Sequence, residues 1–189
     1  MMELVSEAIA FAVKAHDGMR RKKSDAPYIL HPMEAAVIVG TMTEDQNLIA
    51  AAALHDVVED ANITIEEIEE RFGRRVRELV ESETENKRAD LPPETTWRIR
   101  KEESLTVLKD TEDLGVLMVW IGDKLANMRA IYRDFKVEGA EMWQKFNQKD
   151  VNEQAWYYRS IAALTKELSH TSAWLEYKTL TELVFGKGE

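Results

Sequence analysis

The feature that most constrains the fold is the stretch of residues 47–60, which reads NLIAAAALHDVVED. Its first part is an apolar helical run, which has to be buried against other elements. This run leads directly into His55 and Asp56, and one turn later into Glu59 and Asp60. Charged side chains at the end of a buried helix are costly unless something pairs with them. The sequence therefore predicts a core built around this helix and a partner for the acids at its end.

The rest of the chain carries helical patterns and no convincing strand pattern. Thr64 opens a capping box with Glu67, which marks a helix start, and Gly73 marks its end. No internal repeat or interdomain linker interrupts the 189 residues. We therefore predict one all-α domain, with a motif-bearing core at about 4–135 completed by C-terminal helices at about 138–186. The predicted helices span residues 3–16, 32–42, 45–58, 64–72, 74–82, 94–110, 113–134, 138–149 and 153–185.

Composition excludes several classes of protein. The formal net charge of −10 argues against binding to a nucleic-acid polymer, which needs a basic surface. No run of 18 apolar residues is long enough to cross a membrane, and the first residues lack the features of a secretory signal. The absence of cysteine removes disulfides and thiolate zinc sites. We expect a cytoplasmic protein.

Two further surface features have more than one interpretation. Arg20 to Lys23 form one consecutive basic run, which suits a small polyanionic ligand or a merely solvated loop. Tyr157, Trp174 and Tyr177 belong to apolar stripes at helical spacing near the C-terminus. Such a stripe is typical of a core, and the alternative is a homo-oligomer interface.

Histidine and carboxylate side chains are the metal ligands left to a chain without cysteine. His31, next to a predicted helix start, and the adjacent His55 and Asp56 are candidates. Asp123 interrupts a strongly apolar helix, and Asn127, four residues later, projects from the same side. Two histidines and two aspartates from three segments would form an open site suited to Mn²⁺ or another octahedral divalent ion.

Each candidate also has a structural interpretation. A histidine beside an aspartate is often a satisfied buried pair, and Asp123 could pair with Lys124 or Arg129. His16 and His170 lack companion acids, so we expect both to be structural.

The combination of motifs resembles the hydrolase domain of the RelA/SpoT family, and in particular its stand-alone small alarmone hydrolases, within the HD phosphohydrolase superfamily. The similar segments occur in the family's order. They are AHDGMRRKKSDAPYILHP at 15–32, ALHDVVED at 53–60, FGRRVRELVESETENK at 72–87 and GDKLANMR at 122–129. The resemblance implies a compact multi-helix HD-domain fold.

It also implies a metal-dependent removal of the 3′-pyrophosphate from ppGpp or pppGpp, which returns GDP or GTP. Position by position, it implies Mn²⁺ ligands, an acidic pair that orients or deprotonates the attacking water, and a set of residues that hold the nucleotide. The implied ligands are His31, His55, Asp56 and Asp123; the acidic pair is Glu59 and Asp60; the nucleotide-holding residues are Arg21, Lys22 and Asn127.

The spacing supports these roles. His55 and Glu59 are four residues apart, as are Asp56 and Asp60, so ligands and acids share adjacent faces of one helix end. A carboxylate there is well placed to take a proton from a water molecule. No synthetase domain follows residue 189, so we expect this chain to degrade alarmones rather than make them.

The chain departs from the family pattern at three positions. Trp120 stands where the family often has Lys, Ala130 where it often has Thr, and Asp25 where it often has Gly. None is a predicted ligand, so the departures bear on the substrate rather than on hydrolysis. The alternatives are therefore an HD-type phosphatase acting on an adenine alarmone, NADPH or another nucleotide, and a nucleotide-binding module without turnover.

Overall fold

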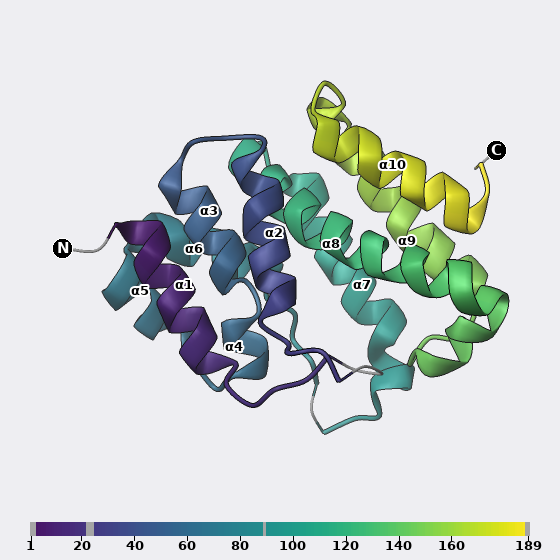
Figure 1. The fold of residues 1–189 in the computed structure, drawn as a ribbon, viewed down its shortest axis with the longest axis horizontal. Coiled ribbons are helices and arrows are strands. Elements are labelled where there is room, and N and C mark those ends of the chain that lie inside the picture. The colour runs from purple at the N-terminus through teal and green to yellow at the C-terminus, as the bar shows by residue number, and fades with distance from the viewer. Residues whose placement is uncertain (1–2, 22–24, 89, 188–189) are drawn as a thin grey trace.

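The computed structural model describes residues 3–21, 25–88 and 90–187, which form a helical structure (Figure 1). The described part of the chain contains no strand, and a single isolated β-bridge joins Arg20 to Pro27. The all-α prediction is confirmed. The α-helices are α1 (Leu4–Ala15), α2 (Leu30–Gly40), α3 (Gln46–Leu54), α4 (Val57–Asp60), α5 (Ile65–Phe72), α6 (Arg74–Glu83), α7 (Pro93–Asp110), α8 (Leu114–Glu138), α9 (Val151–Leu164) and α10 (Ser172–Phe185), with 3₁₀ helices at Gly139–Lys145 and Lys166–Leu168.

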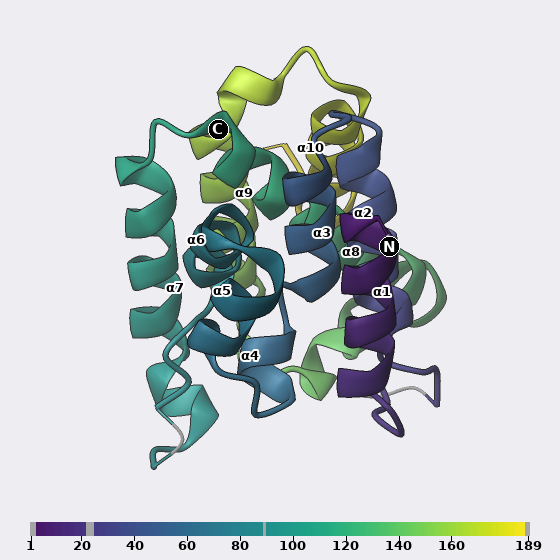
Figure 2. The ribbon, with the colours of Figure 1, turned by 90° about the vertical axis from the view of Figure 1, so that its left-hand side faces the viewer.

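Helix α8 is the centre of the fold. It packs against α2 and α3 on one side and against α10 on another, while α7 packs against α9 (Figure 1). Helices α1 and α6 pack against α3, and α5 packs against α6, at the N-terminal end of the molecule that Figure 2 views directly. The short α4 lies below α3 and α6 in that view. Among the described residues, no helix is long and apolar enough to cross a membrane.

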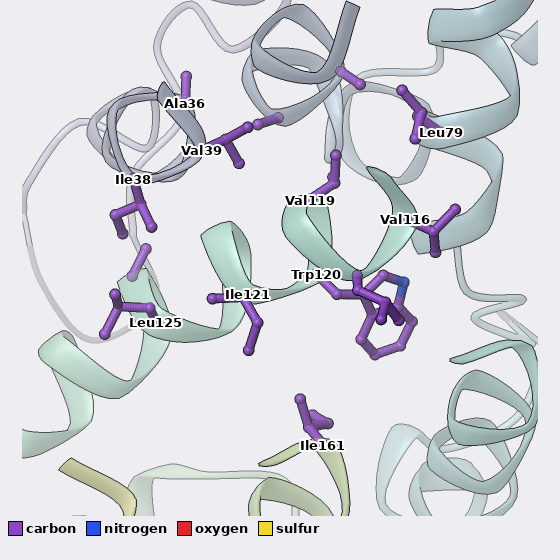
Figure 3. Packing of buried hydrophobic residues seen from close by; sticks show 14 of the residues in the cluster. Ala36, Ile38, Val39, Leu79, Val116, Val119, Trp120, Ile121, Leu125 and Ile161 are labelled. Atoms are coloured by element: carbon purple, nitrogen blue, oxygen red, sulfur yellow. The ribbon is translucent and has the colours of Figure 1, made fainter. Parts of the chain in front are cut away.

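A close contact between α2 and α8 forms part of the core. Val39 of α2 faces Val119 of α8 in Figure 3, and both side chains are fully buried. A Cβ added to Gly122 would lie 2.6 Å from Val39 Cγ2 and 3.0 Å from the Ala35 carbonyl oxygen. Only glycine therefore allows the two helices to approach this closely. Trp120, the residue that replaces the family's Lys, is 1% exposed and belongs to the core.

The helix predicted at 45–58 is interrupted at His55 and Asp56, which separate α3 from α4. In a continuous helix the Ala52 carbonyl would accept a hydrogen bond from the backbone N–H of Asp56. The ring of His55 occupies that carbonyl instead, with Nδ1 at 2.8 Å. The side chain thus competes with the helical ladder and contributes to ending it.

The helix predicted at 153–185 is wrong as one element, because two helices and a short 3₁₀ segment fill that range. Thr171 caps the second helix by accepting a hydrogen bond from the backbone N–H of Trp174, and this cap explains the new start. The segment predicted as a helix at 138–149 contains a 3₁₀ helix instead, because α8 continues to Glu138. The predicted helix start at Thr64 is confirmed, because Thr64 Oγ1 accepts a hydrogen bond from the Glu67 N–H at 3.2 Å and forms the N-cap half of the capping box.

The aromatic stripes near the C-terminus are mostly core, as predicted. Tyr157, Trp174 and Tyr177 are buried. The Tyr177 hydroxyl donates to the Tyr158 carbonyl at 2.9 Å, and the Trp174 indole donates to Thr165 Oγ1 at 3.1 Å. These hydrogen bonds satisfy the polar ends of Tyr177 and Trp174, as is usual for buried aromatic side chains. The buried hydroxyl of Tyr157 has no hydrogen-bond partner within the described structure.

Candidate active site

Three of the predicted ligands meet in one buried cluster. His31 comes from the first turn of α2, His55 from the break after α3, and Asp123 from the middle of α8. Each offers a ligand atom within 4.8 Å of the other two. The Asp123 Oδ1 atom lies 2.9 Å from His31 Nε2 and 3.5 Å from His55 Nε2. A cluster of two imidazoles and one carboxylate with these separations can hold a divalent cation.

The hydrogen bonding of His55 fits a metal ligand. Its Nδ1 lies 2.8 Å from the Ala52 carbonyl oxygen, which can only accept, so Nδ1 carries the proton. Its Nε2 is buried and makes no hydrogen bond within the described structure. A ring fixed by a backbone carbonyl at one nitrogen, with the other nitrogen left for a cation, is the usual arrangement of a metal-binding histidine.

Asp56 lies beside this cluster. Its Oδ2 is 3.1 Å from His55 Nε2 and 3.5 Å from His31 Nε2. The same oxygen accepts a hydrogen bond of 2.7 Å from the Tyr28 hydroxyl. Sequence reasoning did not assign a role to Tyr28, although it lies in the segment PYILHP that carries part of the resemblance. The structure identifies it as the residue that orients Asp56.

The ionisable groups of the cluster strongly affect one another. Burial alone would lower the pKa of His55, but the nearby carboxylates of Asp56 and Asp123 outweigh it and raise the pKa well above its usual range. Burial alone would raise the pKa of Asp123, yet Lys124 and the two histidines hold it well below the usual range. The carboxylates therefore stay ionised and available as ligands.

The predicted acidic pair is carried by α4, directly after Asp56. The Glu59 Oε1 atom accepts a 2.6 Å hydrogen bond from the backbone N–H of Glu85. Lys87 Nζ lies 3.2 Å from Glu59 Oε2 and 2.5 Å from Asp60 Oδ1. Burial raises the pKa of Glu59, and the Glu85 N–H and Lys87 reduce this increase. Neither Glu85 nor Lys87 was among the predicted site residues.

The basic loop reaches the cluster through Arg21. Its Nη2 donates to Asn127 Oδ1 at 3.3 Å, and Asn127 Nδ2 donates to Asp123 Oδ1 at 2.6 Å. The structure thus brings together Arg21 and Asn127, two of the predicted nucleotide-holding residues. Arg20 is exposed and bonded to the Asp25 carbonyl instead. The third predicted residue of this set, Lys22, lies outside the described residues.

A small pocket of about 140 Å³ opens next to Asn127. Lys101 of α7 and Lys124 of α8 line it, together with aromatic side chains that include Trp97, Tyr157 and Tyr158. Lys124 also forms ion pairs with Asp123 and, at 3.3 Å, with Glu83. Burial raises the pKa of Glu83 to about 7. Sequence reasoning missed this pocket, because Lys101 and Lys124 are separated in sequence and α9 supplies much of the wall.

His16 and His170, predicted to be structural, lie in different environments. His16 is buried with its ring 5.0 Å from the ring of Tyr28, and neither of its nitrogens has a hydrogen-bond partner within the described structure. His170 is exposed, and its Nδ1 lies 3.1 Å from the Glu167 carbonyl. His16 therefore borders the site, whereas His170 does not.

Comparisons with known proteins agree with this geometry. The family model for the HD domain matches residues 8–150. The chain is 35% identical over 130 residues to guanosine-3′,5′-bis(diphosphate) 3′-pyrophosphohydrolase of Aquifex aeolicus. This alignment covers 69% of the chain and only 18% of that relative, so the chain spans less than a fifth of the relative's length.

Two solved structures share the architecture. The crystal structure of lmo0812 from Listeria monocytogenes EGD-e has a TM-score of 0.72 and 28% identity, covering 83% of this chain and 99% of that one. A metazoan ortholog of SpoT that hydrolyses ppGpp has a TM-score of 0.77 and 22% identity, covering 99% of this chain and 98% of that one. The second likeness extends the shared fold to almost the whole chain.

Proposed function

Because the chain belongs to the HD domain family, we propose that it is a metal-dependent hydrolase that removes the 3′-pyrophosphate of ppGpp and pppGpp. The observation that carries this proposal is the buried cluster of His31, His55 and Asp123. The acidic pair on α4 directly follows Asp56, which lies 3.1 Å from His55 Nε2. Asn127 donates to Asp123 and accepts from Arg21. Ligands, a proton acceptor and a cation for phosphate are the groups that phosphate-ester hydrolysis needs.

We propose His31, His55, Asp56 and Asp123 as the ligands of one divalent cation, and Mn²⁺ as that cation. The open set of two nitrogens and two oxygens suits a metal with more than four ligands. When bound, such a cation lowers the pKa of water and polarises a phosphoryl oxygen. The protein's part is to hold the four ligands in place, with the Ala52 carbonyl fixing His55 and Tyr28 fixing Asp56.

In the proposed reaction the acidic pair receives the proton of the attacking water. Burial raises the pKa of Glu59, which makes its carboxylate a better base than an exposed one. The oxygen of water forms a bond to the 3′-linked phosphorus, and the bond from that phosphorus to the ribose 3′-oxygen breaks. The 3′-oxygen takes up a proton, so ppGpp and water give GDP and pyrophosphate.

The basic groups around the cluster support a nucleotide polyphosphate as the substrate. Arg21 can pair with a phosphate while it keeps its contact with Asn127, because a guanidinium has five N–H donors. Lys101 and Lys124 add positive charge to the neighbouring pocket, and its aromatic walls suit a base or sugar. The pyrophosphohydrolase of Aquifex aeolicus, whose name describes this reaction, is among the relatives at 35% identity.

The direct test is product analysis after incubation of the purified protein with ppGpp and Mn²⁺. We expect GDP and pyrophosphate in equal amounts, and no turnover after treatment with a chelator. Parallel reactions with Mg²⁺ and Zn²⁺ identify the preferred metal. The adenine alarmone and NADPH are tested in parallel as alternative substrates. Trp120 is buried in the core and does not line the pocket beside Asn127, so its presence does not by itself favour either alternative.

Two matched histidine variants link turnover to the cluster. His55→Ala removes a proposed ligand, whereas His170→Ala removes an exposed ring outside the cluster. We expect the first variant to lose bound metal and turnover, and the second to keep both. Full turnover by His55→Ala would contradict the ligand assignment. Absence of ppGpp turnover by the metal-loaded wild-type protein would contradict the proposed substrate.

A further inference from the structure

The last residue of α6 and the segment that follows it direct three charged side chains toward the candidate active site. Residues 83, 85 and 87 are Glu, Glu and Lys, and Thr84 between the first two has an extended backbone, with φ −74° and ψ 117°. In extended backbone, alternate side chains point to the same side. We call residues 83–87 the 83–87 segment. Each of its three charged residues contacts a different part of the site.

The first two contacts attach this segment to the walls of the site. Glu83 accepts a hydrogen bond from Lys124 at 3.3 Å. The carboxylate of Glu85 accepts from Lys101 at 2.5 Å, from Arg100 at 2.9 Å and from Ser104 at 3.1 Å, all on α7. A carboxylate with three donors is held in one orientation. The backbone of Glu85 is therefore fixed relative to α7.

The third contact connects the 83–87 segment to the acidic pair. Lys87 Nζ bridges Glu59 and Asp60, with 3.2 Å to Glu59 Oε2 and 2.5 Å to Asp60 Oδ1. The other oxygen of Glu59, Oε1, accepts the backbone N–H of Glu85 at 2.6 Å. Both oxygens of the Glu59 carboxylate are thus bonded to this one segment. Its orientation depends on the segment rather than on α4 alone.

We infer that Lys87 is a positioning residue, which together with the Glu85 N–H holds Glu59 and Asp60 in the orientation that hydrolysis requires. This inference rests on the proposed function, because it assigns the acidic pair its role as proton acceptor. Lys87 holds the two neighbouring carboxylates together by contacting one oxygen atom of each. Its own side chain is 43% exposed, whereas the Glu59 side chain is 15% exposed. Water can therefore reach the pair beside the partly exposed Lys87 side chain.

An ordinary ion pair that only anchors a loop would respond differently to mutation. Exposed ion pairs contribute little to stability, so removing one would leave the catalytic rate almost unchanged. A positioning residue affects the rate of the chemical step, because misplacing a catalytic group by about 1 Å can cost on the order of 100-fold. Substrate binding should change little, since the phosphate-binding groups lie elsewhere.

The experiment compares Lys87→Met, Lys87→Arg and Arg88→Gln with the wild-type protein. Arg88 is the matched control, because it belongs to the same loop but pairs with Glu103, away from the acidic pair. With ppGpp and saturating Mn²⁺, we expect Lys87→Met to lower kcat roughly 10- to 100-fold with KM changed less than about threefold. Lys87→Arg should restore most of kcat. Arg88→Gln should behave as wild type.

Amide hydrogen exchange of the same proteins, measured without substrate, tests the inference independently of turnover. Lys87→Met should increase exchange in residues 83–88, including the Glu85 N–H that binds Glu59, whereas Arg88→Gln should leave the Glu85 N–H protected. The inference is overturned if Lys87→Met matches Arg88→Gln in both kcat and exchange. If the wild-type protein fails to hydrolyse ppGpp, the proposed function fails, and unchanged exchange in Lys87→Met would separately exclude the anchoring of Glu59.

Discussion

Arg21 Nη2 donates a hydrogen bond of 3.3 Å to Asn127 Oδ1, so two residues 106 positions apart in the sequence meet beside the cluster of candidate metal ligands. Asn127 in turn donates to Asp123 at 2.6 Å. This chain of two hydrogen bonds connects the basic loop to a proposed metal ligand through α8. Arg21 itself has no contact with the cluster in the described structure. Its proposed role in substrate binding is therefore separate from the metal binding assigned to the cluster.

Replacing Arg21 with alanine should therefore weaken substrate binding and leave the metal in place. A charge-assisted hydrogen bond contributes about 1.5–3 kcal/mol, which corresponds to roughly a 10- to 100-fold increase in KM. Steady-state kinetics with ppGpp measure the change, and metal analysis measures the bound ion. Arg20→Ala is the control, since Arg20 is exposed and its side chain donates to the Asp25 carbonyl rather than to Asn127. Loss of metal in Arg21→Ala would contradict the separation of roles.

Adding the metal should stabilise the folded protein, because the ligands come together only in the native state. At a free metal concentration of 100 times Kd, the gain is about 2.7 kcal/mol. For a chain of this size that corresponds to an increase in Tm of roughly 5–10 °C. Thermal unfolding with Mn²⁺ and with a chelator measures the difference. We expect no such difference in Asp123→Asn, and a full difference in that variant would rule out Asp123 as a ligand.

Replacing Gly122 with alanine should destabilise the fold. The new Cβ would lie 2.6 Å from Val39 Cγ2 and 3.0 Å from the Ala35 carbonyl oxygen, so α2 and α8 would have to separate. Overpacking of this kind costs about 1–3 kcal/mol, and it should also weaken metal binding by moving His31 away from Asp123. Urea unfolding and metal titration check the two effects.

Gly40→Ala is the matched control for the change at Gly122. Its Cβ would lie 3.9 Å from the Ile49 Cδ1 atom, an ordinary contact, and alanine favours a helix over glycine. We expect this variant to be as stable as wild type or slightly more stable. If both glycine variants lose the same stability, the close approach of α2 and α8 does not explain the effect.

The ion pair between Asp113 and Arg75 should make stability depend on pH. Asp113 caps α8 by accepting the Gly115 N–H at 2.8 Å, and it accepts two hydrogen bonds from Arg75. The Arg75 guanidinium lowers the pKa of Asp113 below its usual value. A carboxylate whose pKa is lower in the folded state contributes stability above its unfolded pKa of about 4, and loses it as the pH falls through the folded value.

Asp113→Asn and Asp113→Ala separate the charge from the cap. Asparagine retains the cap, so its loss of stability relative to wild type should shrink toward zero as the pH falls through the lowered folded-state pKa of Asp113. Alanine also loses the cap, which costs about 1 kcal/mol. Urea unfolding of the three proteins between about pH 7 and 3 makes the comparison. A loss in Asp113→Asn that is independent of pH would exclude a role for the charge.

The sequence was sufficient to predict the helical class and the residues that assemble into the cluster. Periodic apolar spacing and the capping box at Thr64 are local signals, so they can be read without a structure. The interruption between α3 and α4 could not be predicted in this way. The His55 ring contributes to this interruption by bonding to the Ala52 carbonyl, and a sequence pattern does not specify the side-chain conformation that makes this contact.

The residues missed by sequence analysis are those whose role depends on distant partners. Tyr28 and Lys87 lie in segments that carry the resemblance and Lys101 does not, but no local pattern reveals the role of any of them. Each acts through a contact with a residue at least 16 positions away. The alternation of Glu83, Glu85 and Lys87 was visible in the sequence. Its meaning required knowing that α7 and α4 lie on either side of the segment.

The close contact between α2 and α8 also determines when the site can form during protein synthesis. A growing chain exposes His31, His55 and Asp56 well before α8 has left the ribosome, and translation proceeds at about 5–20 residues per second. The early segment holds an incomplete ligand set, so a nascent chain should capture metal weakly until Gly122 and Asp123 have docked against α2. Metal uptake would then mark the completion of folding rather than its beginning.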